Sequence, residues 1–275
     1  MARKKPLVRI GLAGFGSVGQ EVARRLLKGD IPGVTLTAIA AADLEKARSN
    51  VARLGGDTIV VPLERLTEHA DIICECATAA AFPEIARRVL LAGKTLMTVS
   101  AAGIPHFPEM AELAEKHGGK VRVVSGGLPG LDGVRAVREG EIRRIKLTSF
   151  QRPDSLAHEP YIRDAGFDFS RPPKERVKVF AGTAREAASA FPRHFNVAIT
   201  LSLAGAGYDK TLVEVWCDPA IPGAVLHVDV EGDAADLTLE SRNRPSESNP
   251  RTSRLVVPSI MAALRSIVEP IHVGT

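Results

Sequence analysis

Three glycines near the start of the chain have the spacing of a dinucleotide-binding turn. The run follows an apolar strand pattern at residues 7–12 and precedes a helical pattern at 20–27; it reads Gly14-Phe15-Gly16-Ser17-Val18-Gly19. Gly14 is expected to make the tight turn, Gly16 to let the backbone approach a diphosphate, and Gly19 to let the helix pack on the strand. The diphosphate would lie at the helix N-terminus, where free N–H groups and the helix dipole favour anions. We therefore predict that the whole run binds a dinucleotide.

The residues after the second predicted strand leave the choice between NAD and NADP open. An acidic side chain at this position accepts hydrogen bonds from the adenosine ribose and selects NAD. Here Ala41 occupies that position and Asp43 follows two residues later. Asp43 is a candidate cofactor contact, but it is also a good helix N-cap. Because Lys46 and Arg48 are near enough in sequence to meet a 2′-phosphate, we expect NAD or NADP.

His227 is a candidate for proton exchange near neutral pH. It lies in an alternating pattern at residues 225–230, which predicts a strand with His227 on the same face as Val225 and Asp229. Leu226 and Val228 would share the opposite face. A hydrogen-bonded structural histidine is the alternative interpretation.

A polar loop at residues 243–253 precedes the last predicted helix. It holds hydroxyls, amides and cations, among them Arg244, Arg251, Thr252 and Ser253. Such donors before a helix favour a carboxylate site, and a loop that only caps the helix is the alternative. Asn196, at the start of an Ala-rich helical pattern, could cap that helix or orient a carbonyl group.

The elements around these residues predict an α/β chain with two domains. Short apolar strands alternate with helices up to about residue 124, which predicts a doubly wound parallel sheet of the Rossmann type. From residue 142 onward alternating strands dominate, which predicts an α+β domain with a mixed or antiparallel sheet. We expect a dinucleotide-binding domain at residues 1–127, completed by a C-terminal helix at 251–275. The substrate and dimerisation domain would span residues 128–250.

Composition excludes several classes of protein. The chain has 275 residues, a net charge of +4 and only 4% aromatic residues, which argues against a nucleic-acid-binding surface. No apolar stretch reaches the ~18 residues of a membrane span, and no signal-peptide pattern is visible. Cys74, Cys76 and Cys217 form no disulfide framework, and no metal site is predicted. We expect a cytoplasmic protein with a small-molecule substrate.

Further motifs follow the glycine run in a fixed order along the chain. They are Glu75-Cys76-Ala77, Ser125-Gly126-Gly127, Gly130-Leu131-Asp132, Phe191-Pro192, Asn196-Val197-Ala198, Leu203-Ala204-Gly205, Asp218-Pro219, His227, Asn243-Arg244-Pro245-Ser246 and Asn249-Pro250-Arg251-Thr252-Ser253. Together with the glycine run, they make the chain similar to the L-aspartate dehydrogenases over nearly its whole length. The family resembles dihydrodipicolinate reductase in its two-domain plan. The ordered set of later motifs is far more specific than the glycine turn, which many dehydrogenases share.

The resemblance implies roles for several residues. His227 would be the catalytic histidine, and Gly127, usually alanine in the family, would contact the cofactor together with Asn196 and Ala77. The substrate would be a dicarboxylic amino acid, and the protein would be a homodimer formed through the second-domain sheet. The reaction would interconvert L-aspartate and iminosuccinate, or oxaloacetate plus ammonia, and could feed NAD biosynthesis.

Departures from the family surround the expected substrate site. Val225 and His194 stand where the family commonly has asparagine, and Gln151-Arg152-Pro153-Asp154 replaces a Lys-Pro-Pro element. His194 is therefore a further candidate substrate contact. Two alternatives follow from these changes: a dehydrogenase of another amino or hydroxy acid, or a non-catalytic dinucleotide-binding sensor.

Overall fold

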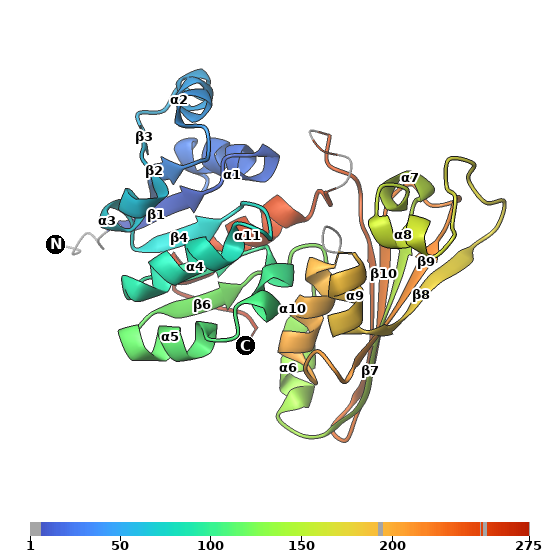
Figure 1. The fold of residues 1–275 in the computed structure, drawn as a ribbon. Coiled ribbons are helices and arrows are strands. Elements are labelled where there is room, and N and C mark those ends of the chain that lie inside the picture. Colours follow the sequence, from blue (N-terminus) through green and yellow to red (C-terminus); the bar gives the residue numbers. More distant parts are fainter. Residues whose placement is uncertain (1–6, 192–194, 248, 250–251, 275) are drawn as a thin grey trace. The chain divides into compact units, whose positions relative to one another are not determined.

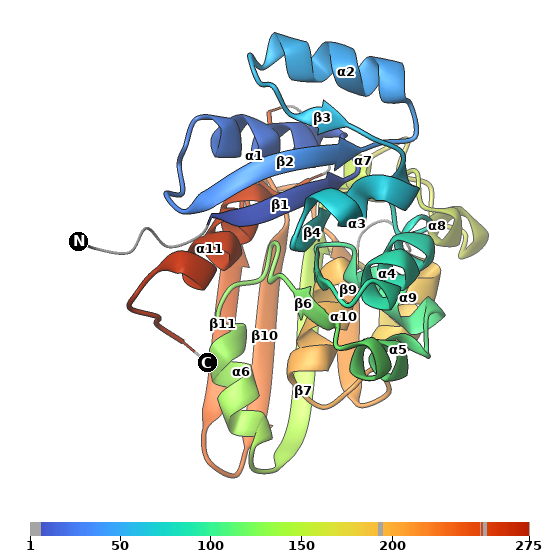
Figure 2. The ribbon, with the colours of Figure 1, turned by 90° about the vertical axis from the view of Figure 1, so that its left-hand side faces the viewer.

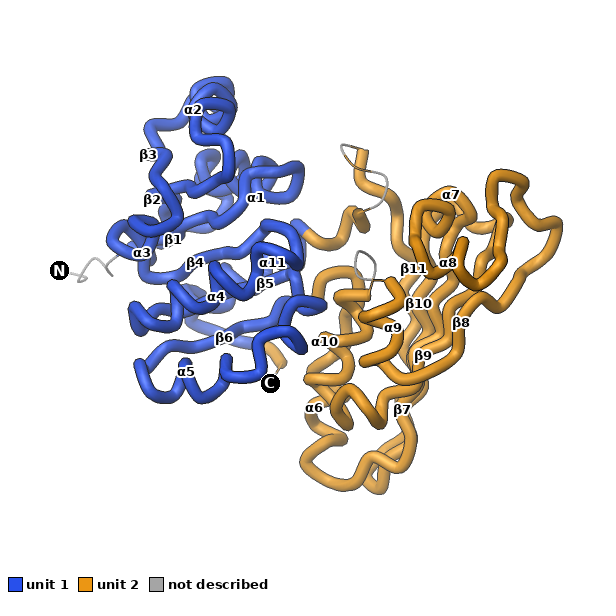
Figure 3. Tube along the Cα trace, viewed as in Figure 1, with its two compact units in different colours: residues 1–124, 257–272 blue, residues 125–256, 273–275 orange. Residues whose placement is uncertain are grey.

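The computed structural model of the chain describes residues 7–191, 195–247, 249 and 252–274. The chain forms two compact units, shown in different colours in Figure 3. Unit 1 comprises residues 1–124 and 257–272, and unit 2 comprises residues 125–256 and 273–275.

Unit 1 contains a six-stranded parallel sheet in the order β3-β2-β1-β4-β5-β6 (Figure 1). The strands are β1 (Val8–Ala13), β2 (Val34–Ala40), β3 (Ile59–Val60), β4 (Ile72–Glu75), β5 (Thr95–Thr98) and β6 (Lys120–Val123). This order is that of a Rossmann fold, in which ligands bind at the carboxyl ends of the strands. The central strands are apolar because helices cover both faces of the sheet.

Helices flank this sheet on both sides. They are α1 (Ser17–Leu27), α2 (Leu44–Arg53), α3 (Leu66–His69), α4 (Phe82–Leu91), α5 (Met110–His117) and α11 (Val256–Val268), with 3-10 turns η1 (Leu63–Arg65) and η2 (Ala101–His106). Figure 2 shows α1 and α11 on one face and α3, α4 and α5 on the other. The parallel Rossmann sheet expected from the sequence is confirmed.

The C-terminal helix α11 is attached to unit 1 by polar contacts. Arg122 of β6 donates to the Ala263 carbonyl at 3.0 Å and to the Ser266 hydroxyl at 2.8 Å. Arg265 donates to the Asp30 carbonyl at 2.7 Å. The helix begins at Val256, so Pro258 lies in its first turn, where its missing N–H costs no helical hydrogen bond.

Unit 2 contains a five-stranded mixed sheet in the order β11-β10-β7-β9-β8. Its strands are β7 (Ile142–Gln151), β8 (Val177–Thr183), β9 (Thr211–Cys217), β10 (Val225–Gly232) and β11 (Asp236–Arg242). Only the β7–β9 pair is parallel; β10 pairs antiparallel with both β7 and β11. The mixed sheet predicted for the second half of the chain is confirmed.

The helices of unit 2 pack on one face of this sheet. They are α6 (Leu131–Arg138), α7 (Pro153–Leu156), α8 (Pro160–Asp164), α9 (Ala184–Ala190) and α10 (Asn196–Ala204). Leu226, Val228 and Val230 of β10 face this core, which also includes Phe191 and Phe195. Alternate residues of the strands therefore lie on the opposite face, which we call the open face. In the described residues, no helix has the length and apolar character needed to cross a membrane.

Candidate cofactor and substrate sites

The glycine turn of unit 1 connects β1 to α1 and leaves no room for side chains at two of its positions. Gly14 has φ +99°, and a Cβ there would lie 2.7 Å from the Ala77 nitrogen. A Cβ on Gly19 would lie 2.3 Å from the Gly14 carbonyl oxygen. The roles predicted for Gly14 in the tight turn and for Gly19 in close helix packing agree with these contacts.

Gly16 presents an open backbone at the start of α1. It is the N-cap residue, and no side chain caps the first turn of this helix. A Cβ on Gly16 would meet no atom of the described residues within 4 Å. The turn therefore offers free N–H groups and space beside them, which fits the diphosphate of a dinucleotide.

Ala77 lies in the loop that follows β4, directly against this turn. Its N–H donates to the Glu75 carboxylate at 2.6 Å, and Cys76 donates to the Ala13 carbonyl at 2.8 Å. Glu75 is only 1% exposed, and burial raises the pKa of its carboxyl, while hydrogen bonds from Thr98, Ala77 and Ser100 act in the opposite direction. The structure thus joins Ala77 and the glycine turn, as expected for one cofactor site.

Asp43, a candidate cofactor contact, caps the N-terminus of helix α2. Its side chain accepts from the Lys46 N–H at 2.9 Å, and it is the N-cap of α2. Arg48 is paired with Glu45 on the same helix. The end of β2 therefore shows no carboxylate dedicated to a ribose, and the structure agrees with NAD or NADP.

Unit 2 contains a cavity of ≈ 280 Å³ at the end of β7 and the start of β10. Most of the residues that line it have polar side chains: the lining residues are Gln151, Arg152, Asp154, Ser155, His158, Gly223, Ala224, Asn243, Arg244, Pro245, Asn249, Thr252 and Ser253. Three of the residues predicted from the polar loop, Arg244, Thr252 and Ser253, are brought together here. Amides, hydroxyls and guanidinium groups are donors suited to a small carboxylate ligand.

Asn243 connects this cavity to Gly127. Its amide nitrogen donates to the Gly127 carbonyl and to the Ser241 hydroxyl, both at 3.1 Å. The Ser253 hydroxyl donates to the Asn243 amide oxygen at 2.5 Å. Asn243 is 8% exposed, so these bonds are sheltered from water. The proposed cofactor-contact position Gly127 therefore adjoins the polar cavity.

The two arginines of the cavity differ in their partners. Arg152 is held by Asp154 through two hydrogen bonds, at 2.9 and 2.5 Å, and donates to the Pro222 carbonyl at 3.3 Å. The Arg244 guanidinium has no hydrogen-bond or ion-pair partner among the described residues. Arg244 is therefore the cation available to a bound anion.

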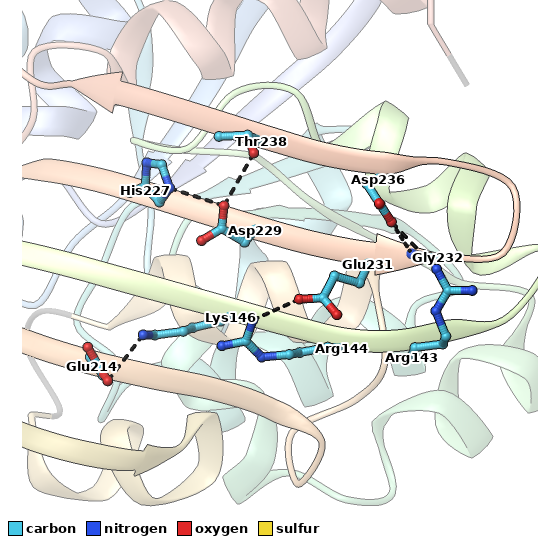
Figure 4. A network of polar contacts seen from close by, with 10 residues as sticks. All are labelled: Arg143, Arg144, Lys146, Glu214, His227, Asp229, Glu231, Gly232, Asp236 and Thr238. Carbon is cyan, nitrogen blue, oxygen red and sulfur yellow. Dashed lines mark hydrogen bonds and ion pairs between the residues drawn. The ribbon is translucent and has the colours of Figure 1, made fainter.

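His227 lies on the open face of the sheet, as its alternation with Leu226 and Val228 predicted. Its Nε2 atom is 3.1 Å from Asp229 Oδ1, and its Nδ1 atom is 3.8 Å from Glu240 Oε2. Thr238 donates to the same Asp229 oxygen at 3.2 Å, and Figure 4 shows His227, Asp229 and Thr238 together. The imidazole is thus placed between two carboxylates.

The structure does not bring His227 into the polar cavity of unit 2. The cavity is lined by Gln151 and Asn243, whose positions alternate with those of the open-face residues Phe150 and Arg242. Ala224 also lines the cavity and precedes His227 by three residues, roughly 10 Å along an extended strand. Within unit 2, the cavity residues Gln151, Ala224 and Asn243 therefore lie on the face of the sheet opposite to His227.

Three further residues, Asn196, His194 and Arg251, were predicted to contact the cofactor or the substrate. Asn196 is the first residue of α10, and its carbonyl accepts from the Thr200 hydroxyl at 2.8 Å. His194 and Arg251, both expected near the substrate, lie outside the described residues. The described residues hold no group of three or more His, Cys, Asp or Glu side chains arranged for a metal ion.

The cavity residues that the sequence did not single out include Gln151, His158 and Asn243. Asn243 was part of a recognised motif, but nothing in its spacing showed that it joins Gly127. Gln151 and His158 lie in the stretch where the chain departs from the family, so the resemblance gave them no role. Their position at the end of β7 becomes evident only when the strands are paired.

Comparisons with known proteins agree with this arrangement. The family pattern described as "Homoserine dehydrogenase, NAD binding domain" matches residues 14–124, and "Aspartate dehydrogenase, C-terminal" matches residues 132–267. "L-aspartate dehydrogenase 3" of Bordetella bronchiseptica is 38% identical over 97% of both chains. L-aspartate dehydrogenase of Bradyrhizobium diazoefficiens is 37% identical over 98% of this chain and 94% of its own length.

A solved structure shows the same fold. The crystal structure of aspartate dehydrogenase from Thermotoga maritima superposes with a TM-score of 0.72, at 20% identity, covering 97% of this chain and 99% of the other. The Rossmann unit with its glycine turn and the mixed-sheet unit define an NAD(P)-binding oxidoreductase. The full-length similarity then defines the family: the chain belongs to the L-aspartate dehydrogenases.

Proposed function

We propose that this protein catalyses the NAD(P)-dependent oxidative deamination of L-aspartate. Bound NAD(P) supplies the hydride acceptor, and Cα of the substrate loses a hydride while its amine loses a proton, giving iminosuccinate. Water then converts iminosuccinate to oxaloacetate and ammonia. The structural observation that supports the proposal most is the hydrogen bond between Asn243 and Gly127, because Asn243 lines the cavity proposed for a carboxylate and Gly127 is the proposed cofactor contact.

The cavity of unit 2 is the proposed site for a substrate carboxylate. Arg244 supplies a cation that has no partner within the described part of the chain, and the hydroxyls of Thr252 and Ser253 line the same space. Arg152, held in place by Asp154, provides a second guanidinium just after the end of β7. Two cations and several hydroxyl or amide groups match a dicarboxylic amino acid better than a neutral one.

His227 is the proposed proton-exchanging residue, on the strength of the family resemblance. A hydrogen bond between a ring nitrogen and a carboxylate orients an imidazole, and the Asp229 carboxylate lies within that distance of His227. His158, which lines the cavity, is the competing histidine. Variants of the two residues distinguish them, as described in the Discussion.

We further propose that the protein is a homodimer formed through the sheet of unit 2. Charges of both signs alternate across the open face of this sheet: Arg144 is paired with Glu231 at 2.8 Å, and Lys146 with Glu214 at 3.1 Å (Figure 4). A face that carries both signs is able to complement a second copy of itself about a two-fold axis. Sedimentation of the purified protein tests this: a dimer supports the proposal, and a monomer at micromolar concentration contradicts it.

The resemblance to the L-aspartate dehydrogenases also supports a proposal for the role of this protein in the cell. A cytoplasmic enzyme that forms iminosuccinate from L-aspartate would supply a precursor for NAD biosynthesis. We expect a strain that lacks the gene for this protein to contain less NAD when L-aspartate is its only source of iminosuccinate. An unchanged NAD content in that strain would contradict this role.

The direct experiment measures NAD(P)H formation by the purified protein with a panel of amino and hydroxy acids. We expect turnover with L-aspartate and either or both cofactors. Turnover with another acid but not with L-aspartate would favour a different substrate in the same enzyme class. NADH binding without turnover of any acid would favour the sensor.

A further inference from the structure

Glu75 is a buried carboxyl at the edge of the sheet where the dinucleotide site lies. It is the last residue of β4, and its neighbours in the sheet are Ala13 of β1 and Thr98 of β5. Its exposed fraction is only 1%. Burying a carboxyl is unfavourable unless it is hydrogen-bonded, so a buried carboxyl at such a place calls for a specific role.

Three donors satisfy this carboxyl. The Ala77 N–H and the Ser100 hydroxyl donate to Oε1 at 2.6 and 3.0 Å, and the Thr98 hydroxyl donates to Oε2 at 2.6 Å. The Ser100 N–H in turn donates to the Thr98 hydroxyl oxygen at 3.0 Å. Glu75 therefore ties the loop after β4 to the loop after β5.

The glycine turn rests on the first of these loops. A Cβ on Gly14 would come within 2.7 Å of both the Cys76 carbonyl carbon and the Ala77 nitrogen, so the two backbones are in direct contact. The Cys76 N–H also donates to the Ala13 carbonyl, one residue before the turn. A shift of residues 76–77 would therefore displace Gly14.

We propose that Glu75 is a positioning residue for the dinucleotide. Its carboxyl holds the Cys76–Ala77 backbone against Gly14, so that the turn keeps the shape in which its N–H groups meet the diphosphate. Glu75 touches neither substrate nor cofactor in this role; it acts through Ala77. The proposal concerns cofactor binding alone, so its outcome is independent of the identity of the substrate.

The test measures the dissociation constant of NADH for the full-length protein by fluorescence titration. Glu75→Ala removes the acceptor for all three donors, and we expect NADH binding to weaken about tenfold or more. Glu75→Gln keeps one oxygen for Ala77 and Ser100, so we expect binding within about threefold of the parent protein. Thr98→Val removes one of the three donors to Glu75 and also the acceptor of the Ser100 N–H, and it tests the same network if Glu75→Ala does not fold.

Cys74→Ala is the matched control. Cys74 is buried on the same strand, and its Sγ lies 3.8 Å from Met97 Sδ, away from the loop network. Its loss should lower the melting temperature but leave the NADH dissociation constant unchanged. Weakened NADH binding in a folded Glu75→Ala or Thr98→Val variant, with Cys74→Ala unaffected, supports the proposal. Binding within twofold of the parent in those folded variants, or equal weakening by Cys74→Ala or Glu75→Gln, overturns it.

Discussion

The amide nitrogen of Asn243 lies 3.1 Å from the Gly127 carbonyl oxygen, and this bond joins two segments more than a hundred residues apart in the sequence. Asn243 lines the polar cavity, and Gly127 is the proposed cofactor contact. A Cβ on Gly127 would lie 3.3 Å from the Asn243 amide oxygen. The alanine common at this position in the family would therefore press on Asn243, whereas glycine leaves the bond undisturbed.

Replacing Asn243 tests this connection. In Asn243→Asp, a carboxylate oxygen would replace the donor and face the Gly127 carbonyl oxygen, so the bond becomes a repulsion. We expect kcat/KM for L-aspartate to fall about 100-fold, measured by initial rates. Ser241→Ala removes a 3.2 Å donor to the same carbonyl and one acceptor of the Asn243 amide, but it leaves the bond from Asn243 to Gly127, so it should cost less than about fivefold. Equal losses in the two variants would show that Asn243 has no special role.

Arg244 should contribute mainly to substrate binding. Arg244→Ala removes the uncommitted cation of the cavity, and we expect KM for L-aspartate to rise roughly 10- to 100-fold with a smaller change in kcat. The matched control is Arg242→Ala, because Arg242 lies two residues earlier on the open face and is paired with Glu240 at 2.7 Å. An equal rise in KM in both variants would contradict the proposal that the cavity binds the substrate carboxylate.

His227 and His158 are compared by the same substitution. His227→Ala should retain NADH binding and lose at least ~100-fold in kcat, the usual scale for general acid–base catalysis. His158→Ala should change KM more than kcat, because His158 lines the cavity. Stopped-flow and steady-state rates of both variants decide between them. Near-normal turnover in His227→Ala would contradict its proposed role.

Glu75 predicts a pH dependence of stability. Burial raises the pKa of its carboxyl. Between the pKa of the unfolded chain and the pKa of the folded protein, the folded protein therefore retains a proton that the unfolded chain releases. Its contribution is therefore fully present below the unfolded pKa and is lost as pH rises through the folded pKa. The side chain of Glu75→Gln cannot ionise. The free energy of unfolding of this variant should therefore increase relative to that of the parent protein as pH rises. Urea unfolding at several pH values measures this; a relative loss for Glu75→Gln on raising pH would contradict the sign.

Local patterns were sufficient for much of the fold. The glycine run between a strand and a helix and the short apolar strands predicted the parallel sheet of unit 1, because both signals lie within a few neighbouring residues. The pattern at 225–230 also placed His227 on the correct face. Strand β8 was missed, since its residues lie next to a Pro- and charge-rich stretch that obscures the alternation. Helix α6 was missed because Gly133 interrupts a short helical pattern.

The candidate sites were harder to predict because they depend on contacts between distant segments. The cavity forms where β7 ends beside the start of β10 and the end of β11, so Gln151, Ala224 and Asn243 meet only through strand pairing. The single-sequence pattern identified Arg244 as a cation in a polar loop but gave no sign that its guanidinium lacks a partner among the residues that the structure describes. The separation of His227 from that cavity likewise follows from the parity of the strands, which depends on how they pair.

The most direct measurement of the central claim compares kcat/KM for L-aspartate with kcat/KM for L-alanine, using NAD and NADP in turn. L-alanine lacks the distal carboxylate, so it leaves a guanidinium of the cavity without its partner. The account predicts a preference for L-aspartate of ~100-fold or more with at least one cofactor. Equal values for the two amino acids, or no NAD(P)H formation with L-aspartate, would contradict it.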